Sequence, residues 1–133
     1  MPHGAPACSI TEKNMDAKCY VKYQRYGRRK VGQVLDQIRG KSLYEAERIL
    51  GTLPMRCTEV LQKAVKSAGA NLSVKLGRKV DLREVWVKEA FANQGPTKFL
   101  RRMQPGPQGR AMPFKRKMCH ITMTVSDTKE AGR

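Results

Sequence analysis

The stretch GPTKFLRRMQPGPQGRAMPFKRKMCHITMTV, residues 95–125, forms most of a long arm and ends in a strand-like segment. Apolar and polar side chains alternate over residues 119–126, which predicts a strand with one buried face. Its apolar positions are Cys119, Ile121, Met123 and Val125. A second strand is predicted before the arm, over residues 84–92. Residues 93–117 lie between the two strands, and connections this long are uncommon in compact domains unless they are functional or disordered.

The arm is rich in cations and contains no acid, because no Asp or Glu occurs between Ala90 and Ser126. Its cations are Lys98, Arg101, Arg102, Arg110, Lys115, Arg116 and Lys117. If the flanking strands pair antiparallel, the arm doubles back and reaches about 40 Å. Self-repulsion and a lack of apolar partners predict no fixed shape in isolation, and order only among phosphates. A disordered basic loop without a role is the less favoured alternative, because patterned strands anchor both ends.

The middle of the arm is uncharged and predicts a tight reversal around a Pro-Gly-Pro sequence. This tip consists of Met103, Gln104, Pro105, Gly106, Pro107, Gln108 and Gly109. Without a cation, the tip cannot bind phosphate as strongly as the limbs of the arm.

The whole chain has 133 residues and a formal net charge of +16, which indicates one domain that binds a polyanion. Nucleic acid is the usual polyanion and an anionic membrane surface is the rival. No apolar run approaches the ~20 residues of a spanning helix, so we expect no membrane insertion.

A second acid-free cluster consists of Lys18, Lys22, Arg25, Arg28, Arg29 and Lys30. It is either a solvated face or, together with the arm, a wide footprint on folded nucleic acid.

The rest of the pattern predicts a strand over residues 17–23, with Cys19, Val21 and Tyr23 on one face, followed by three helices. The first helix ends at Gly40. The second begins with a capping box at Ser42 and is closed by Gly51, and Pro54 opens the third. Buried positions are predicted at Val31, Val34, Leu35 and Ile38 in the first helix, and at Cys57, Leu61, Ala64, Val65, Ala68 and Leu72 in the third.

The expected fold is therefore α+β, with a small antiparallel sheet, three helices and a long extended arm. Residues 1–16 are expected to be a flexible leader, residues 17–127 a single domain with an arm at about 93–117, and residues 128–133 a flexible tail.

Catalytic and metal-binding functions lack the residues they need. The two histidines are His3 and His120, neither with an evident orienting carboxylate, and no phosphate-binding glycine loop occurs. The four cysteines, at positions 8, 19, 57 and 119, are too widely spaced for a usual zinc site. We expect no catalytic residue, metal or cofactor. A DNA regulator using the helix at residues 28–40 is less favoured, because that helix offers Asp36 and a largely apolar face.

Four ordered blocks of the sequence resemble the ribosomal protein L22 family of the large subunit, of bacterial or organellar type. They are RKVGQVLDQIRGKSLYEAERIL (29–50), AVKSAGAN (64–71), WVKEAFANQGPT (86–97) and GRAMPFKRKMCHITMTVSD (109–127). The resemblance implies a body on the subunit surface, and a β-hairpin that threads through large-subunit ribosomal RNA. It also implies that the hairpin tip, residues 103–109, lines the nascent-peptide tunnel.

The resemblance further implies which residues and partners are involved. Arg29, Lys30 and Lys41 match basic positions around the first helix, and His120 matches the returning strand. The implied partners are ribosomal RNA, neighbouring large-subunit proteins and the nascent peptide, in a bacterial cytoplasm or an organelle with a weak plastid-like lean. The main alternative is a free RNA- or chromosome-associated protein.

Overall fold

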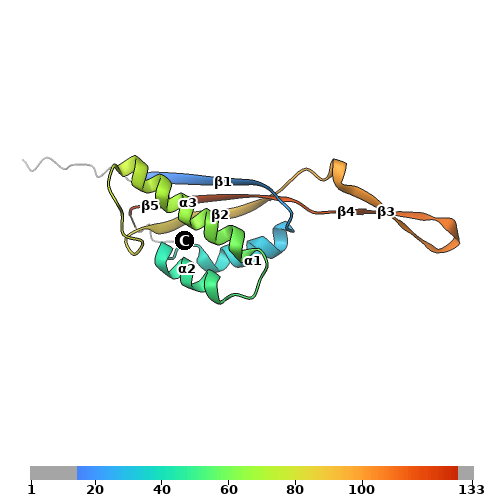
Figure 1. Cartoon of the computed structure of the whole chain (residues 1–133), viewed down its shortest axis with the longest axis horizontal. Helices are drawn as coiled ribbons and strands as arrows, with labels where there is room; N and C mark the ends of the chain where they lie inside the picture. Colours follow the sequence, from blue (N-terminus) through green and yellow to red (C-terminus); the bar gives the residue numbers. More distant parts are fainter. Residues whose placement is uncertain (1–14, 129–133) are drawn as a thin grey trace, which may run out of the picture.

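A three-stranded sheet, three helices and a projecting two-stranded arm make up the fold in the computed structural model, which describes residues 15–128 (Figure 1). In chain order the elements are β1 (Asp16–Gln24), α1 (Arg28–Ile38), α2 (Leu43–Thr52), α3 (Thr58–Leu76), β2 (Trp86–Gln94), η1 (Lys98–Leu100), β3 (Arg101–Pro105), η2 (Pro107–Gly109), β4 (Ala111–Lys115) and β5 (Cys119–Ser126). The predicted α+β class is confirmed. Most of the expected flexible leader (1–16) and tail (128–133) lies outside the described residues, and Asp16, expected at the end of the leader, is the first residue of β1.

Strand β5 is the centre of the sheet, whose order is β1-β5-β2. It pairs antiparallel with β1, where Asp16 faces Ser126, and antiparallel with β2, where Gln94 faces Cys119. Because β2 and β5 run in opposite directions side by side, the arm between them doubles back as predicted.

The core lies between the sheet and the helices, which all cover the same face (Figure 1). Every buried position predicted in the first helix, the third helix and the last strand is buried. Helix α2 packs against α3 at Gly69, where an added Cβ would lie 3.2 Å from Cδ1 of Leu43. The small residues near Gly69 therefore allow the two helices to approach closely.

The boundary between α2 and α3 differs from the prediction. Gly51 lies inside α2, which continues to Thr52, and Leu53 takes an extended conformation that ends the helix. A residue that precedes proline disfavours helical geometry, so Pro54 stops α2 rather than opening α3. Helix α3 begins at Thr58, whose hydroxyl donates to the Met55 carbonyl at 2.7 Å. The Ser42 half of the predicted capping box of α2 is present, with the Glu45 N–H donating to Ser42 Oγ at 3.3 Å.

The end of β1 contains a bulge that the alternating pattern did not predict. The pairing with β5 is interrupted between Val21 and Gln24, and Tyr23 has a φ of 57°. The prediction that Tyr23 shares the buried face with Cys19 is wrong, because this side chain is exposed. Its N–H donates to Nδ1 of His120 at 3.0 Å, and the two rings meet edge to face at 4.8 Å.

Both limbs of the arm start from one tight contact. The Gly95 N–H donates to the Met118 carbonyl at 2.8 Å, and a Cβ on Gly95 would lie 3.1 Å from Cβ of Met118. Further out, the Arg116 N–H donates to the Leu100 carbonyl at 3.1 Å, and β3 then pairs with β4. The ten residues of β3 and β4 are all exposed. Figure 1 shows this hairpin projecting away from the body.

The exposure of β3 and β4 predicts a large difference in amide exchange between arm and body. In the isolated protein, amides from Thr97 to Phe114 should exchange fast, because a two-stranded ribbon without buried side chains opens at little cost in free energy. Amides of α3, whose apolar side is buried, should exchange slowly. Exchange followed by mass spectrometry measures both in one sample, and arm protection equal to that of α3 would contradict the prediction.

Candidate nucleic-acid-binding surface

The two cationic clusters predicted from the sequence meet where the arm leaves the body. A groove of about 980 Å³ lies there, which we call the junction groove. The body contributes Arg25 and the first turn of α1, and the arm contributes Arg116 and Lys117. The cations that line the groove are Arg25, Arg28, Arg29, Lys30, Arg56, Arg116 and Lys117. The fold therefore joins clusters that are far apart in the sequence into one surface.

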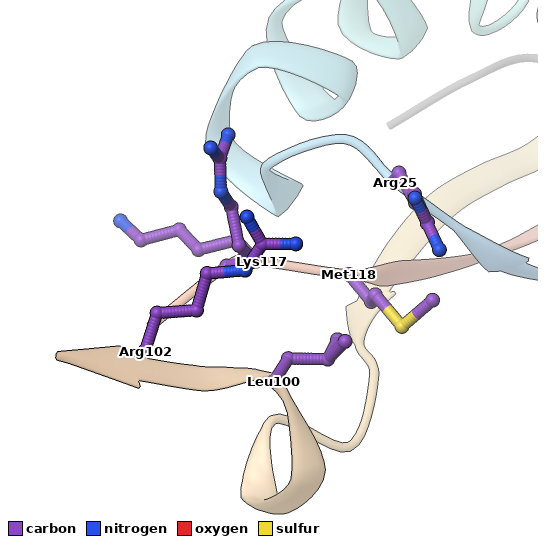
Figure 2. A pocket seen from close by; sticks show the side chains of 6 residues that line it. Arg25, Leu100, Arg102, Lys117 and Met118 are labelled. Carbon is purple, nitrogen blue, oxygen red and sulfur yellow. The ribbon is translucent and has the colours of Figure 1, made fainter. Parts of the chain in front are cut away.

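A smaller cavity of about 300 Å³ continues the junction groove toward the arm (Figure 2). Arg25 reaches it from the body, whereas Arg102 reaches it from β3. Figure 2 shows the side chains of Leu100 and Met118 close to one another at the base of the arm. The cavity is therefore apolar at its base and cationic around its rim.

The electrostatics of the junction groove favour an external anion. No Asp or Glu is among the described residues that line the groove or the smaller cavity. Helix α1 begins with Arg28, Arg29 and Lys30 and has no acid in its first turn. Cations at the positive end of a helix dipole are unfavourable, and like charges in one groove repel each other. A bound polyanion would relieve both effects.

The other predicted cations lie outside the groove. Lys18 and Lys22 are exposed on β1, and Lys41 is exposed between α1 and α2. Lys98, Arg101, Arg110 and Lys115 are exposed along the arm. The Arg116 guanidinium carbon lies 5.7 Å from the centre of the Phe114 ring, which places a cation over an aromatic face at the base of β4.

His120 has an intramolecular role that the sequence did not predict. Its Nδ1 accepts the Tyr23 N–H, so this nitrogen holds the bulge at the end of β1. Nε2 is the ring nitrogen left for a contact with phosphate.

Arg56 lines the junction groove but was missed in the sequence. Its carbonyl accepts a hydrogen bond from the Tyr26 hydroxyl at 3.0 Å, which ties the loop before α3 to the loop before α1. One sequence signal could have identified Arg56 as a binding residue: it is a cation two residues before the N-terminus of α3, the end of a helix where anions are preferred. The misplaced start of α3 concealed it.

A metal-binding group, a reactive thiol and a membrane-spanning helix are three features not found in the described residues. Between residues 15 and 128, no group of three or more His, Cys, Asp or Glu could hold a metal ion. Burial raises the pKa of the Cys119 thiol, with a smaller opposing effect from a hydrogen bond to the Tyr26 backbone and a further increase from nearby Cys57. A buried thiol with a raised pKa is a poor nucleophile. None of the helices in this range has the length and apolar character to cross a membrane.

Comparison with known proteins finds one family across most of the chain. The family model described as ribosomal protein L22p/L17e matches residues 19–126. Large ribosomal subunit protein uL22 of Clostridium tetani is 43% identical over 113 residues, which are 85% of this chain and 98% of that protein. Protein uL22c of Porphyra purpurea is 40% identical over 119 residues, which are 90% and 99% of the two chains. Protein uL22 of Pelotomaculum thermopropionicum is 43% identical over 116 residues, or 87% and 99%.

The junction groove predicts strongly salt-dependent binding to structured RNA. If seven to ten cations meet phosphates, the logarithm of the binding constant should fall with the logarithm of salt concentration with a slope of about −5 to −9. Replacing Arg102 by Glu should lower affinity at moderate salt by roughly fivefold or more, because one attraction becomes a repulsion.

Lys66→Glu is the matched control, since it makes the same charge change on the exposed side of α3 and lies in a separate hollow beside Glu47. Filter binding across a salt series measures both quantities. A slope near zero, or equal losses for Arg102→Glu and Lys66→Glu, would contradict a specific role for the junction groove and the smaller cavity that continues it, where Arg102 lies.

Proposed function

The chain belongs to the ribosomal protein L22p/L17e family, and we infer from this that it is a structural, non-enzymatic constituent of the large ribosomal subunit. Its partners are large-subunit ribosomal RNA and other ribosomal proteins. The match over residues 19–126 includes both the body and the arm, so both are parts of the family's common structure.

The observation that carries the RNA-binding proposal is the junction groove, where cations of the body and of the arm share one acid-free surface. We propose that the predicted cations and Arg56 contact RNA phosphates. The body cluster and the two limbs of the arm would then bind RNA from two directions. Phosphate contacts of this kind fix position without reading base sequence.

The tip is proposed to border the nascent-peptide tunnel. The Gly106 N–H donates to the Arg110 carbonyl at 2.7 Å, and Gln108 and Gly109 both have left-handed φ values, of 58° and 71°. The reversal is therefore tight. It requires glycine at position 106, because an added Cβ would lie 3.0 Å from the Arg110 carbonyl oxygen. Residues 103–109 carry no charge, which suits a surface next to a passage that carries peptides of any charge.

The free nucleic-acid-binding protein is the alternative function, and sedimentation separates it from the ribosomal one. Tagged protein should travel with the large subunit on a sucrose gradient at a magnesium concentration that dissociates the two subunits. Recovery at the top of the gradient would overturn the ribosomal assignment. Relatives named uL22 and uL22c match at similar identity, so the choice between a bacterial and a plastid ribosome stays a prediction from the sequence.

Charge reversal at the base of the arm should prevent incorporation into the subunit. With Lys115, Arg116 and Lys117 replaced by Glu, three attractions to RNA become repulsions at short range. Subunit profiles with immunodetection should then show the variant only in unassembled fractions. A double reversal at Lys63 and Lys66 on the exposed side of α3 is the control, with a net-charge change of −4 against −6 for the triple variant, and it should reduce incorporation far less for each reversed charge. Normal incorporation of the triple variant would show that this limb is not embedded in RNA.

Deletion of Gln104 to Gln108 should leave assembly close to normal, because the deleted residues carry no phosphate-binding charge. The expected change is in the tunnel, as an altered response to a stalling peptide in a toe-printing assay. Subunit profiles of the same strain serve as the control for assembly. If the deletion blocks assembly as severely as the triple charge reversal, the tip acts in RNA folding and the proposed division between limbs and tip is wrong.

A further inference from the structure

The face of the β1-β5-β2 sheet opposite the helices exposes aromatic side chains. Tyr20 of β1 and Phe91 of β2 both pair with Thr122 of β5, so the three residues form one row across the sheet. Tyr20 is 60% exposed and Phe91 is 40% exposed. Figure 1 shows the helices on the other side of the sheet. The two rings are two strand spacings apart, about 10 Å, which is far enough to contact two different partner groups.

A third aromatic ring joins this face because of the bulge in β1. Regular alternation would turn Tyr23 toward the core, whereas its positive φ leaves the ring 59% exposed against His120. Positive φ is unfavourable for a bulky residue without glycine's freedom, and the Tyr23 N–H bond to His120 holds it in place. His120 pairs with Asn93 of β2, one row nearer the arm than the row of Tyr20 and Phe91.

Cations border these rings. Lys18 and Lys22 alternate with Tyr20 along the exposed side of β1, and Arg25 follows where β1 meets the junction groove. Two acids lie near the rings. Glu89 pairs with Thr124, one row beyond Phe91 and away from the arm, and Asp36 of α1 shares a hollow with Phe91 in which Arg28, Arg29 and Arg39 outnumber it. A partner that extends from the groove along β1 therefore meets cations and flat aromatic rings together, which is the combination that binds unpaired nucleic acid.

We propose that this face, defined by Tyr20, Tyr23 and Phe91, is a stacking platform for unpaired bases of ribosomal RNA. The inference rests on the proposed function and adds a second mode of binding to it. Phosphates would lie along Lys18, Lys22 and the groove, while splayed bases stack on the rings. A continuous RNA duplex cannot use the platform, because its bases are already stacked on one another.

The choice of RNA over a protein follows from charge. An apolar protein partner gains little from the lysines beside the rings, and it would bury them at a cost. An unpaired RNA strand offers phosphates for the lysines and a base for every ring. A protein contact at this face is one of the outcomes that the experiment separates.

The first experiment compares binding of the full chain to an unpaired oligonucleotide and to an RNA duplex. A Tyr20→Leu, Phe91→Leu double variant keeps apolar side chains but removes both rings. It should lose roughly 25-fold or more in affinity for the single strand, from about fivefold or more for each ring, and change duplex affinity less than twofold. Tyr44→Leu is the control, since Tyr44 is an exposed aromatic on α2 with Arg83 5.0 Å from its ring.

Two further variants keep the test valid if the double variant is unstable. Tyr20→Phe and Phe91→Tyr preserve the rings and should bind the single strand like the parent protein. Thermal melting followed by circular dichroism checks that each variant is folded. Equal losses for single strand and duplex, equal losses for Tyr44→Leu, no loss for the double variant, or a loss in the ring-preserving variants would each overturn the platform.

The second experiment locates the contact inside the particle. Large subunits irradiated with ultraviolet light and digested with trypsin should give RNA crosslinks on the peptides 19–22 and 89–98, which contain Tyr20 and Phe91. Crosslinks from these peptides to a protein, or RNA crosslinks confined to residues 99–117, would overturn the platform and leave the ribosomal function standing. Absence of the chain from the particle would instead overturn the proposed function itself.

Discussion

The pairing of β5 with both β1 and β2 is the constraint on which the rest of the structure depends. It closes the sheet, gives the helices a surface to cover, and brings the two limbs of the arm together at Gly95 and Met118. Because the two strands at the base of the arm are hydrogen-bonded neighbours, the arm leaves the body as a narrow ribbon. The groove between arm and body follows from the same pairing, since β1 delivers Arg25 to the place where β5 receives the chain from Lys117.

The distribution of charge distinguishes the arm from the body. The body supplies shape through an apolar core, whereas the arm has almost no interior of its own and depends on its surroundings. The groove, the limbs and the open sheet face thus suit different parts of RNA: phosphates for the cations, and unpaired bases for the rings. The reversal around Gly106 carries no charge, so it offers no cation to a phosphate.

Regular periodicity made much of this fold predictable. The apolar stripe of α3 and the apolar positions of β5 are buried as predicted, because each repeats with a regular period. The polar face of β5 departs from the predicted alternation, because Thr124 and Ser126 are buried as well. The bulge at Tyr23 was not readable, since it depends on His120, which is far away in the sequence. The end of α2 was misplaced because Gly51 was given more weight than Pro54. The sequence predicts most cations of the groove, but their convergence and the contribution of Arg56 depend on the tertiary fold.

The central position of β5 also sets an order of events during synthesis. Of the described strands, β1 is synthesised first and β5 last. Strand β1 therefore cannot pair until β5 has been made, and Asp16 cannot pair with Ser126 before then. At roughly 5–20 residues per second, more than a second passes while the arm alone emerges. During that time the apolar sides of α1 and α3 have no complete sheet to cover. A nascent chain that stops within the arm would therefore carry an unfinished core, and such chains are substrates for chaperones and prone to aggregation.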